Sequence, residues 1–543
     1  MPWYLVLLSI MGTQASAITF LSAPGQAFTD GMRFVQYYFG LPLAMVVLCI
    51  TFVPRFSKLR VFTAYEFLEK RFDLKTRMFT SFLFLLQRGL STGISIYAPS
   101  IILSSLLGWN IVITNIVMGG MLIIYTVTGG ARAVAYTQQL QFGIIFIGMF
   151  LAGYMIVHQL PEGIGLFDAL KVSGAAGKLN VITTGIKDGA FDWNDRYNIF
   201  SGVIGGFFLA LSYFGTDQSQ VGRYLTAKNN TESKLGLLMN GIVKVPMQFF
   251  ILLIGALLFT FYQFKPSPVF HNLAVEQKAL TTTYRDSLLA VKESYNALNR
   301  QQNHLSIGYV NASHGGVQIS EQGFKDSLQR GNAQMQELRT QYKSYIRKAL
   351  PLADNNDTNY IFLRFVLDFL PVGLIGLLIA IIFMASWGSI AAALNSLASC
   401  TMIDFHQRFR KKDESELLER TTVREYQTSK WYTLAWGVFC IIVAQFANRM
   451  GSLIEAVNVL GSLFYGVILG IFLVAFYMKK IGGKAVFWSA VISEIMVVTL
   501  FTLNQQEIIG LSFLWLNVVG ALLVVILAWT AQLFIKEQPR LEV

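Results

Sequence analysis

Runs of about 20 apolar residues recur along this chain, and they limit its possible folds more than any other feature. A helix of that length crosses a hydrocarbon core about 30 Å thick. Twelve runs are found, at residues 3–22, 34–54, 78–107, 110–128, 139–158, 196–215, 236–262, 369–403, 429–447, 452–478, 484–503 and 511–535. Charged residues make up only 14% of the chain, whereas soluble proteins have about 25%. The sequence therefore predicts an all-α integral membrane protein.

The basic residues indicate how these predicted spans are oriented. They gather in every second loop, for example at 55–77, 223–234 and 408–412. Loops rich in lysine and arginine stay on the cytoplasmic side of a membrane. We therefore expect a multi-pass protein of the cell (inner) membrane with a cytoplasmic C-terminus, embedded in the lipid bilayer. The same distribution explains the net charge of +12 without a nucleic-acid partner.

One long segment has the composition of a soluble domain. Residues 265–360 lie on the predicted outer side, between the seventh and eighth spans, and are rich in Gln, Asn, Ser, Lys and Arg. Apolar residues recur at three-and-four spacing from Leu280 to Leu298 and again from Phe324 to Tyr345, as they do in helices with one apolar face. We expect an extracytoplasmic helical hairpin, which either caps the core passively or docks an outer-side partner.

Small and polar residues interrupt two of the predicted spans. The first span has the string Gly12-Thr13-Gln14-Ala15-Ser16 at its middle, and the sixth has several glycines between Gly202 and Gly215. A broken helix is tolerated only where it lines a cavity, because lipid cannot satisfy free amide groups. Two broken helices five spans apart indicate an inverted repeat around a central binding site. We predict a five-plus-five inverted-repeat (LeuT-like) transporter core with two additional C-terminal helices.

These patterns divide the chain into four parts. Residues 1–264 are expected to form the first repeat and the start of the second, and residues 361–478 the remainder of the second repeat. Residues 265–360 are the hairpin insertion, and residues 479–543 are the peripheral C-terminal helices.

Six strings carry a resemblance to a known family, and together they cover nearly the whole chain apart from the hairpin. They are PWYLVLLSIMGTQASAITFLSAPG at 2–25, AYEFLEKRF at 64–72, ISIYAPSIILSSLLG at 94–108, GGARAVAYTQQLQ at 129–141, DQSQVGRYLTAK at 217–228, and LPVGLIGLL through ALNSLASCTMIDF at 370–405. In this order they resemble the sodium/solute symporter family, in particular its bacterial-type iodide, monocarboxylate, multivitamin and sialic acid branches. The resemblance implies a secondary active transporter that imports a small organic solute by alternating access, coupled to sodium.

The resemblance also implies a sodium site at the first and eighth spans. Backbone carbonyls of Gly12, Ala15 and Ala385 and the hydroxyl of Ser389 would bind the ion. Gly388 stands where the family has a second hydroxyl, and it has none. Because hard cations take oxygen ligands, the loss of one ligand of about five weakens the site unless water or solute replaces it.

Other ligand sets find little support in the sequence. Some family members have a second sodium site that needs an Asp in the fifth span, but Gln138 stands there, and Ala391 and Ala392 stand where hydroxyls would help. The histidines and cysteines form no metal-binding pattern. No nucleophile elbow, phosphate loop or catalytic carboxylate pair occurs in the spans. We expect sodium as the coupling ion, no other metal, no cofactor and no enzymatic activity.

The solute pocket is expected at the span interruptions and on the helices that face them. Its candidate residues are Gln14, Ser16, Thr19, Tyr38, Arg88, Tyr213, Lys244 and Asn458. An ionisable group inside a membrane costs about 2.5–3.5 kcal/mol on insertion scales, so Lys244 is a functional candidate. The alternative is a lysine that reaches the cytoplasmic interface. Arg88 either pairs with a carboxylate on an anionic solute or packs against backbone carbonyls.

Two functions of different classes remain open at this stage. The first is a symporter that takes up a small organic solute, anionic if Arg88 or Lys244 binds it. The alternative is a transporter-like solute sensor with little or no coupled flux. The replaced ion ligands at Gly388 and Gln138 favour the sensor slightly, whereas the lack of an attached kinase or output domain disfavours it.

Overall fold

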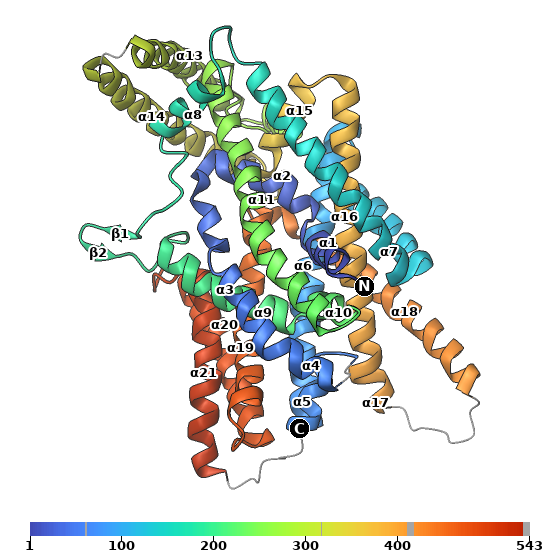
Figure 1. Ribbon diagram of the computed structural model, residues 1–543. Helices are drawn as coiled ribbons and strands as arrows, with labels where there is room; N and C mark the ends of the chain where they lie inside the picture. Colours follow the sequence, from blue (N-terminus) through green and yellow to red (C-terminus); the bar gives the residue numbers. More distant parts are fainter. Residues whose placement is uncertain (60–61, 316–317, 410–417, 536–543) are drawn as a thin grey trace.

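The computed structural model (Figure 1) describes residues 1–59, 62–315, 318–409 and 418–535, and within these ranges it leaves out some side chains, including those of 130–140. The described chain is helical apart from one pair of two-residue strands, β1 (Ile186–Lys187) and β2 (Ala190–Phe191), which pair antiparallel. The basic residues 410–412, used above to orient the chain, lie outside the described residues.

The first part of the chain contains most of the elements around the molecular centre. They are α1 (Trp3–Gln14), α2 (Ala17–Asp30), η1 (Met32–Tyr38), α3 (Leu41–Val47), η2 (Leu48–Phe52), α4 (Val53–Leu59), α5 (Glu66–Arg71), α6 (Leu74–Leu107), α7 (Ile111–His158), α8 (Leu166–Ala175), η3 (Ser201–Gly205), α9 (Gly206–Thr216), α10 (Gln218–Leu225) and α11 (Asn230–Phe264).

The second part contains the hairpin and the remaining long helices. They are α12 (Leu273–Ala279), α13 (Arg285–Gly315), α14 (Gln318–Ala349), η4 (Thr358–Tyr360), α15 (Ile361–Phe369), α16 (Val372–Cys400), η5 (Thr401–His406), α17 (Gln407–Phe409), α18 (Leu418–Ala444), η6 (Ala447–Arg449), α19 (Leu453–Tyr477), α20 (Gly483–Gln505) and α21 (Phe513–Phe534).

The predicted spans agree well with the helices. Among the described residues, nine helical stretches are long and apolar enough to cross a membrane, and α1 with α2 forms a tenth that is bent by 64°. Each of these ten overlaps a predicted span. The predicted spans 196–215 and 429–447 also coincide with helices, η3–α9 and α18, which are shorter or less apolar in the described part. The chain is thus a multi-pass membrane protein whose spans are helical.

The bend between α1 and α2 lies where the first span was predicted to break. Helix α1 ends at Gln14, Ala15 and Ser16 are not helical, and α2 begins at Ala17. The chain continues in a new direction because both linking residues have extended or intermediate backbone angles, with ψ of 81° at Ala15 and 171° at Ser16.

The sixth span differs from the prediction. Its glycines do not break the helix, which continues through η3 and α9 to Thr216, and the interruption comes at Asp217. There the Asp217 carboxylate accepts the backbone N–H of Ser219 at 2.8 Å and caps α10. The glycines instead allow close packing: a Cβ at Gly202 would lie 2.3 Å from the carbonyl oxygen of Gln36, and one at Gly206 would lie 2.4 Å from that of Tyr37.

Two further helices, α7 and α19, are also continuous. The predicted spans 110–128 and 139–158 belong to one continuous helix, α7, with no loop between them. Helix α19 is also continuous from Leu453 to Tyr477, so Asn458 lies within its second turn and not at a break.

The helices pack around a centre formed by α1, α6, α9, α16 and α19. Helix α16 contacts α1, α6, α7 and α18, and α19 contacts α6, α9, α20 and α21. Figure 1 shows α13 and α14 side by side at one end of the molecule, beyond α8, while α5 and α17 lie at the opposite end. The hairpin thus lies at one end of the molecule, and the central helices lie between the two ends.

The hairpin is attached to the helical core by specific hydrogen bonds. Asn303 donates to the carbonyl of Phe264 at the end of α11, and Gln329 donates to the carbonyl of Ala175 at the end of α8, both at 2.8 Å. At its base, the fully buried Asp357 accepts from Arg339 at 2.8 Å and pairs with Lys343 at 2.6 Å. These bonds therefore hold the hairpin on the core at several points along its length.

Candidate functional site

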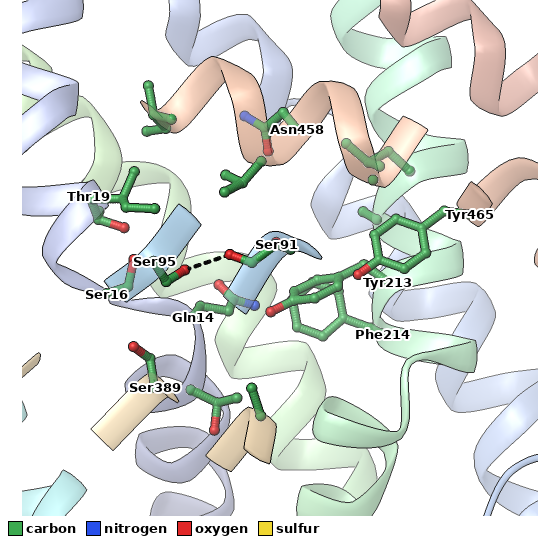
Figure 2. Close-up of a pocket in the computed structure, with 18 of the residues that line it drawn as sticks. Gln14, Ser16, Thr19, Ser91, Ser95, Tyr213, Phe214, Ser389, Asn458 and Tyr465 are labelled. Atoms are coloured by element: carbon green, nitrogen blue, oxygen red, sulfur yellow. Dashed lines mark hydrogen bonds between the residues drawn. The ribbon is translucent and has the colours of Figure 1, made fainter. Parts of the chain in front are cut away.

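A cavity of about 160 Å³ lies at the centre of the helix bundle. Figure 2 shows side chains from the α1–α2 break, α6, α9, α16 and α19 facing this space. All eight candidate solute residues line it, together with the candidate ion ligand Ser389; the eight are Gln14, Ser16, Thr19, Tyr38, Arg88, Tyr213, Lys244 and Asn458. The structure therefore brings together residues that are up to 444 positions apart in the sequence, from Gln14 to Asn458.

The break between α1 and α2 releases two backbone carbonyls. In a continuous helix the N–H of Ser16 would bond to the carbonyl of Gly12, and the N–H of Thr19 to that of Ala15. Here the Ser16 N–H donates to Gln14 at 2.9 Å, and the Thr19 N–H donates to Ser16 at 3.0 Å. The carbonyls of Gly12 and Ala15, both named as candidate ion ligands, thus lose their usual helical donors.

The eighth-span candidates lie on α16, which contacts α1. The hydroxyl of Ser389 donates to the carbonyl of Ala385 at 3.0 Å and to that of Ser386 at 3.2 Å. Because its proton is directed back along the helix, the oxygen lone pairs of Ser389 are available to a cation. Gly388 precedes it and supplies no side-chain oxygen.

Two cations reach the cavity, and their surroundings differ. Lys244 on α11 is 3% exposed, and its ammonium lies 5.7 Å from the ring centroid of Tyr38. Among the described residues it forms no ion pair. Arg88 on α6, by contrast, lies 3.8 Å from the buried carboxylate of Asp217. The charge of Arg88 is therefore balanced within the protein, whereas that of Lys244 is not.

The other polar groups of the cavity are partly bonded to one another. Tyr37 donates to the amide oxygen of Asn458 at 3.0 Å, and Gln220 donates to the hydroxyl of Tyr213 at 2.7 Å. The amide nitrogens of Gln14 and Asn458 have no partner among the described residues. An unpaired buried donor costs about 1–3 kcal/mol, so these groups favour a polar ligand in the cavity.

Sequence reasoning missed a polar stripe on α6. Gln87, Ser91, Thr92 and Ser95 all line the cavity, and Figure 2 shows Ser91 and Ser95 on one side of it. Their spacing of three to four residues places them on one helix face. That period, within an otherwise apolar span, was a signal that could have identified them.

Asp217 is a second missed residue. Its carboxylate accepts from the hydroxyl of Tyr465 at 2.7 Å and from that of Ser219 at 2.6 Å, in addition to facing Arg88. Asp217 belongs to the string DQSQVGRYLTAK, but its distance in sequence from Arg88 gave no indication that the two would meet.

The residues named against a second sodium site are only partly described. Ala391 and Ala392 are fully buried and pack with Tyr125, which gives both methyl groups an apolar environment. The side chain of Gln138 lies outside the described residues. Within the described part of the chain, no group of three or more His, Cys, Asp or Glu side chains is placed to bind a metal.

Comparisons with known proteins find a family and relatives that match most of the chain. The model of the sodium:solute symporter family matches residues 1–287 and 345–493, and so excludes most of the hairpin helices α13 and α14. The sodium/sialic acid symporter NanT of Aliivibrio fischeri is 24% identical over 98% of this chain and 86% of its own. The human sodium-coupled monocarboxylate transporter 1 is 32% identical over 43% of this chain and 37% of its own.

A solved structure shows the same fold. It is a sodium-coupled sialic acid symporter in a substrate-bound, outward-open state, described as revealing a novel sodium site. It covers 99% of this chain and 91% of its own with a TM-score of 0.72, at 22% sequence identity.

Proposed function

Because this chain belongs to the sodium:solute symporter family, and so is a sodium-coupled secondary transporter and not an enzyme, we propose that it carries a small organic anion through the central cavity. Relatives named for sialic acid and monocarboxylates support this class of solute. The alternative of a solute sensor without coupled flux finds no support in these comparisons.

The observation that carries the proposal is the environment of Lys244. Its ammonium is buried beside Tyr38 and forms no ion pair among the described residues. An isolated buried charge is unfavourable until a counter-charge arrives. A carboxylate on the solute would provide one, while Gln14 and Asn458 would donate hydrogen bonds to its other oxygens. Arg88, balanced by Asp217, is then a residue that shapes the cavity and not the main anion ligand.

We propose that the coupling ion binds beside the solute, at the break between α1 and α2. The released carbonyls of Gly12 and Ala15, the hydroxyl oxygen of Ser389 and the carbonyl of Ala385 are the candidate ligands. Sodium takes oxygen ligands, and oxygens buried at membrane depth can replace part of its hydration shell. One released carbonyl pair and one hydroxyl support a single sodium ion, with water or the solute carboxylate at the position that Gly388 leaves without a ligand.

The orientation of the transporter is also a proposal. The basic residues of α4, α5 and α17 lie at the end of the molecule opposite the hairpin (Figure 1), which supports a cytoplasmic position for that end. Cysteine labels at Gln301 on α13 should then react from outside intact cells, and labels at Arg408 only after permeabilisation. Labelling of Arg408→Cys in intact cells would reverse the orientation. A protein partner for the exposed face of the hairpin stays a prediction.

Uptake by the purified protein in liposomes tests the proposed solute class. Sialic acid, lactate and glucose are offered with and without an inward sodium gradient, and we expect sodium-driven uptake of an acid and none of glucose. Lys244→Met should raise the half-saturating solute concentration about 10- to 100-fold, because a charged hydrogen bond is worth about 1.5–3 kcal/mol. Lys234→Met, on the same helix but away from the cavity, is the control. Uptake that prefers the neutral sugar would contradict the proposal.

A further inference from the structure

A second cavity, of about 420 Å³, lies between the hairpin and the end of the membrane core. It is lined by α14, by the end of α2, by the end of α11, by Ser267 and by Tyr295 of α13, and Lys178 lines it after α8. Figure 1 shows α14 and α8 at the same end of the molecule, next to the end of α11. We refer to this space as the outer cavity.

Several hydrogen-bond donors in the walls of the outer cavity are unpaired. The hydroxyl of Tyr262, the Nε of Arg339 and the amide nitrogen of Asn332 have no partner among the described residues, and Tyr262 and Arg339 are only 1% and 5% exposed. The amide oxygen of Gln263, 4% exposed, is one unpaired acceptor beside them. Lys178 uses one proton on the carbonyl of Thr29, which leaves the others of its ammonium for a ligand.

The charges around the outer cavity also favour an anion. Three cations, Lys178, Arg339 and Lys343, face two carboxylates, Asp30 and Asp357, which leaves one positive charge. Asp357 is committed to Arg339 and Lys343, and Asp30 accepts from Gln26 at 2.5 Å. Lys178 lies 4.9 Å from the ring centroid of Phe259 and has no ion pair among the described residues, so its charge is the least compensated.

The outer cavity exists because of the hairpin insertion. The matched family model ends at residue 287 and resumes at 345, so the α14 residues Asn332 and Arg339 fall outside it. The hydrogen bonds of Gln329 to Ala175 and of Asn303 to Phe264 hold this wall in place. The two cavities share helix α2, with Thr19 in the central one and Phe28 in the outer one. Thr19 and Phe28 are nine positions apart on this helix, which corresponds to about 14 Å along its axis.

We infer that the outer cavity is a second binding site, for a small organic anion rich in acceptor oxygens, which loads from outside before the anion reaches the central cavity. The unpaired donors recognise its oxygens and Lys178 its charge, while Phe28, Phe259 and Tyr262 contact its carbon skeleton. That the anion is also the transported solute rests on the proposed function. Binding at the outer cavity does not.

Thiol-reactive ions test the site without knowledge of the natural ligand. The three native cysteines are buried. A new cysteine at Asn332 in the outer cavity is compared with one at Gln334, which is on the same helix but exposed. Anionic sulfonatoethyl methanethiosulfonate is compared with its cationic trimethylammonium-ethyl analogue. We expect the anion-to-cation rate ratio at Asn332→Cys to exceed that at Gln334→Cys about tenfold, and the anion reaction to saturate with concentration.

Variants of Lys178 identify the cause of that selectivity. Lys178→Met should bring the ratio at Asn332→Cys to the value at Gln334→Cys, and Lys178→Arg should preserve it. An unchanged unfolding temperature in detergent shows that each background is still folded, and an unchanged reaction rate at Gln334→Cys shows that the reagents themselves behave alike. Equal ratios at the two positions, or a ratio that Lys178→Met leaves unchanged, would overturn the outer site.

The pH dependence provides an independent check. Burial lowers the pKa of Lys178 to about 8; Asp30 opposes this shift, and Arg339 and Arg33 add to it. The anion preference should therefore be strongest below pH 8 and decline as the pH rises through 8, because the ammonium is lost. A preference at Asn332→Cys that is constant from pH 6 to pH 9 with Lys178 intact would exclude Lys178 as the charge that selects the anion.

Protection by sialic acid separates this inference from the proposed function. We expect sialic acid to slow the reaction at Asn332→Cys, and to do so also in the Lys244→Met background, where uptake is impaired. Anion selectivity without protection would overturn the identity of the anion as the transported solute and leave the outer site standing. Protection that disappears with Lys244→Met would assign it to the central cavity and overturn the independent outer site.

Discussion

Asp354, in the segment between α14 and η4, is expected to make the stability of the protein depend on pH. It is 6% exposed, and its carboxylate accepts from the hydroxyl of Tyr97 at 3.3 Å and from the N–H of Asn356 at 3.1 Å. Burial raises the pKa of Asp354 to about 7; Asp357 acts in the same direction and Lys343 opposes it. The native state therefore favours the protonated carboxyl.

The sign of the effect on stability follows from linkage. Since the folded-state pKa exceeds the unfolded value of about 3.9, the stabilisation is present below pH 4 and is lost as the pH rises through 7. We expect wild type to unfold at a lower temperature at pH 8 than at pH 5, and its free energy of unfolding to be lower at pH 8 by at most about 3 kcal/mol, because about two pH units lie between pH 5 and the folded-state pKa of about 7. Asp354→Asn should remove most of this difference, and the partly exposed control Asp192→Asn should retain it. A difference that survives in Asp354→Asn would assign the effect to another group.

Ser389 and its neighbour Gly388 form a matched pair for testing the ion site. Ser389→Ala removes the inferred hydroxyl ligand and should raise the half-saturating sodium concentration of uptake about tenfold. Gly388→Ser adds a hydroxyl at the adjacent position and should lower it. Ser399→Ala, which is also on α16 but away from the cavity, is the control. An unchanged sodium response in both test variants would show that the ion binds elsewhere.

At the residue scale, the sequence identified side chains whose chemistry is unusual for a membrane helix. Lys244 and Arg88 were predicted to line the solute pocket because charged residues are rare in membrane spans. The Gly12–Ser16 string was predicted to break its helix because it interrupts an apolar run. Asp217 and Tyr465 were not found, since only the fold brings them to Arg88. The different roles proposed for Arg88 and Lys244 depend on a single carboxylate, that of Asp217, which no spacing rule could place.

At the scale of elements, a charged network joins α6 to the end of α16. Arg77 is 1% exposed and donates to the carboxylate of Asp404 at 2.5 Å and to that of Glu69 at 2.6 Å. Thr63 and Ser81 each donate to Asp404 at 2.9 Å. This network ties the segment before α5 to η5, at the end of the molecule away from the hairpin.

Breaking this network should be more costly than breaking an exposed pair. Arg77→Met leaves the fully buried Asp404 without its cation, which should destabilise the protein by about 3–5 kcal/mol. Arg77→Met combined with Asp404→Leu should recover a large part of that loss, because no buried charge then remains. Arg364→Met, in a partly exposed pair with Asp368, should cost at most about 1 kcal/mol. Thermal unfolding in detergent measures all three, and equal losses in Arg77→Met and Arg364→Met would contradict the argument.

Helix positions were predictable because the hydrocarbon core requires long apolar runs, and ten of the predicted spans coincide with candidate spans of the structure. The interruptions were harder to predict. Glycines mark both flexible breaks and close packing, and at Gly202 and Gly206 close packing decides. The actual break at Asp217 depends on a cap, which is a feature of two or three residues within a long polar string.

At the scale of the whole molecule, the charge carried per cycle follows from the site. If the proposed site carries one sodium ion together with one monoanion bound at Lys244, the cycle moves no net charge, so the membrane potential adds nothing. A tenfold sodium gradient then supplies about 1.4 kcal/mol and limits accumulation to about tenfold. We expect a Hill coefficient for sodium near one and uptake that does not change when a potassium diffusion potential is imposed. A coefficient near two, together with an inward current, would require a second sodium site.

The break between α1 and α2 has a consequence for evolution. The oxygens released by the break are backbone carbonyl oxygens. Every amino acid that can adopt the bend at these positions therefore provides them. Mutations at positions 12 and 15 would therefore leave the proposed ion ligands in place, while the side chains around the cavity remain free to diverge. Transporters that descend from an ancestor with this break can therefore change the transported solute and keep the same coupling ion.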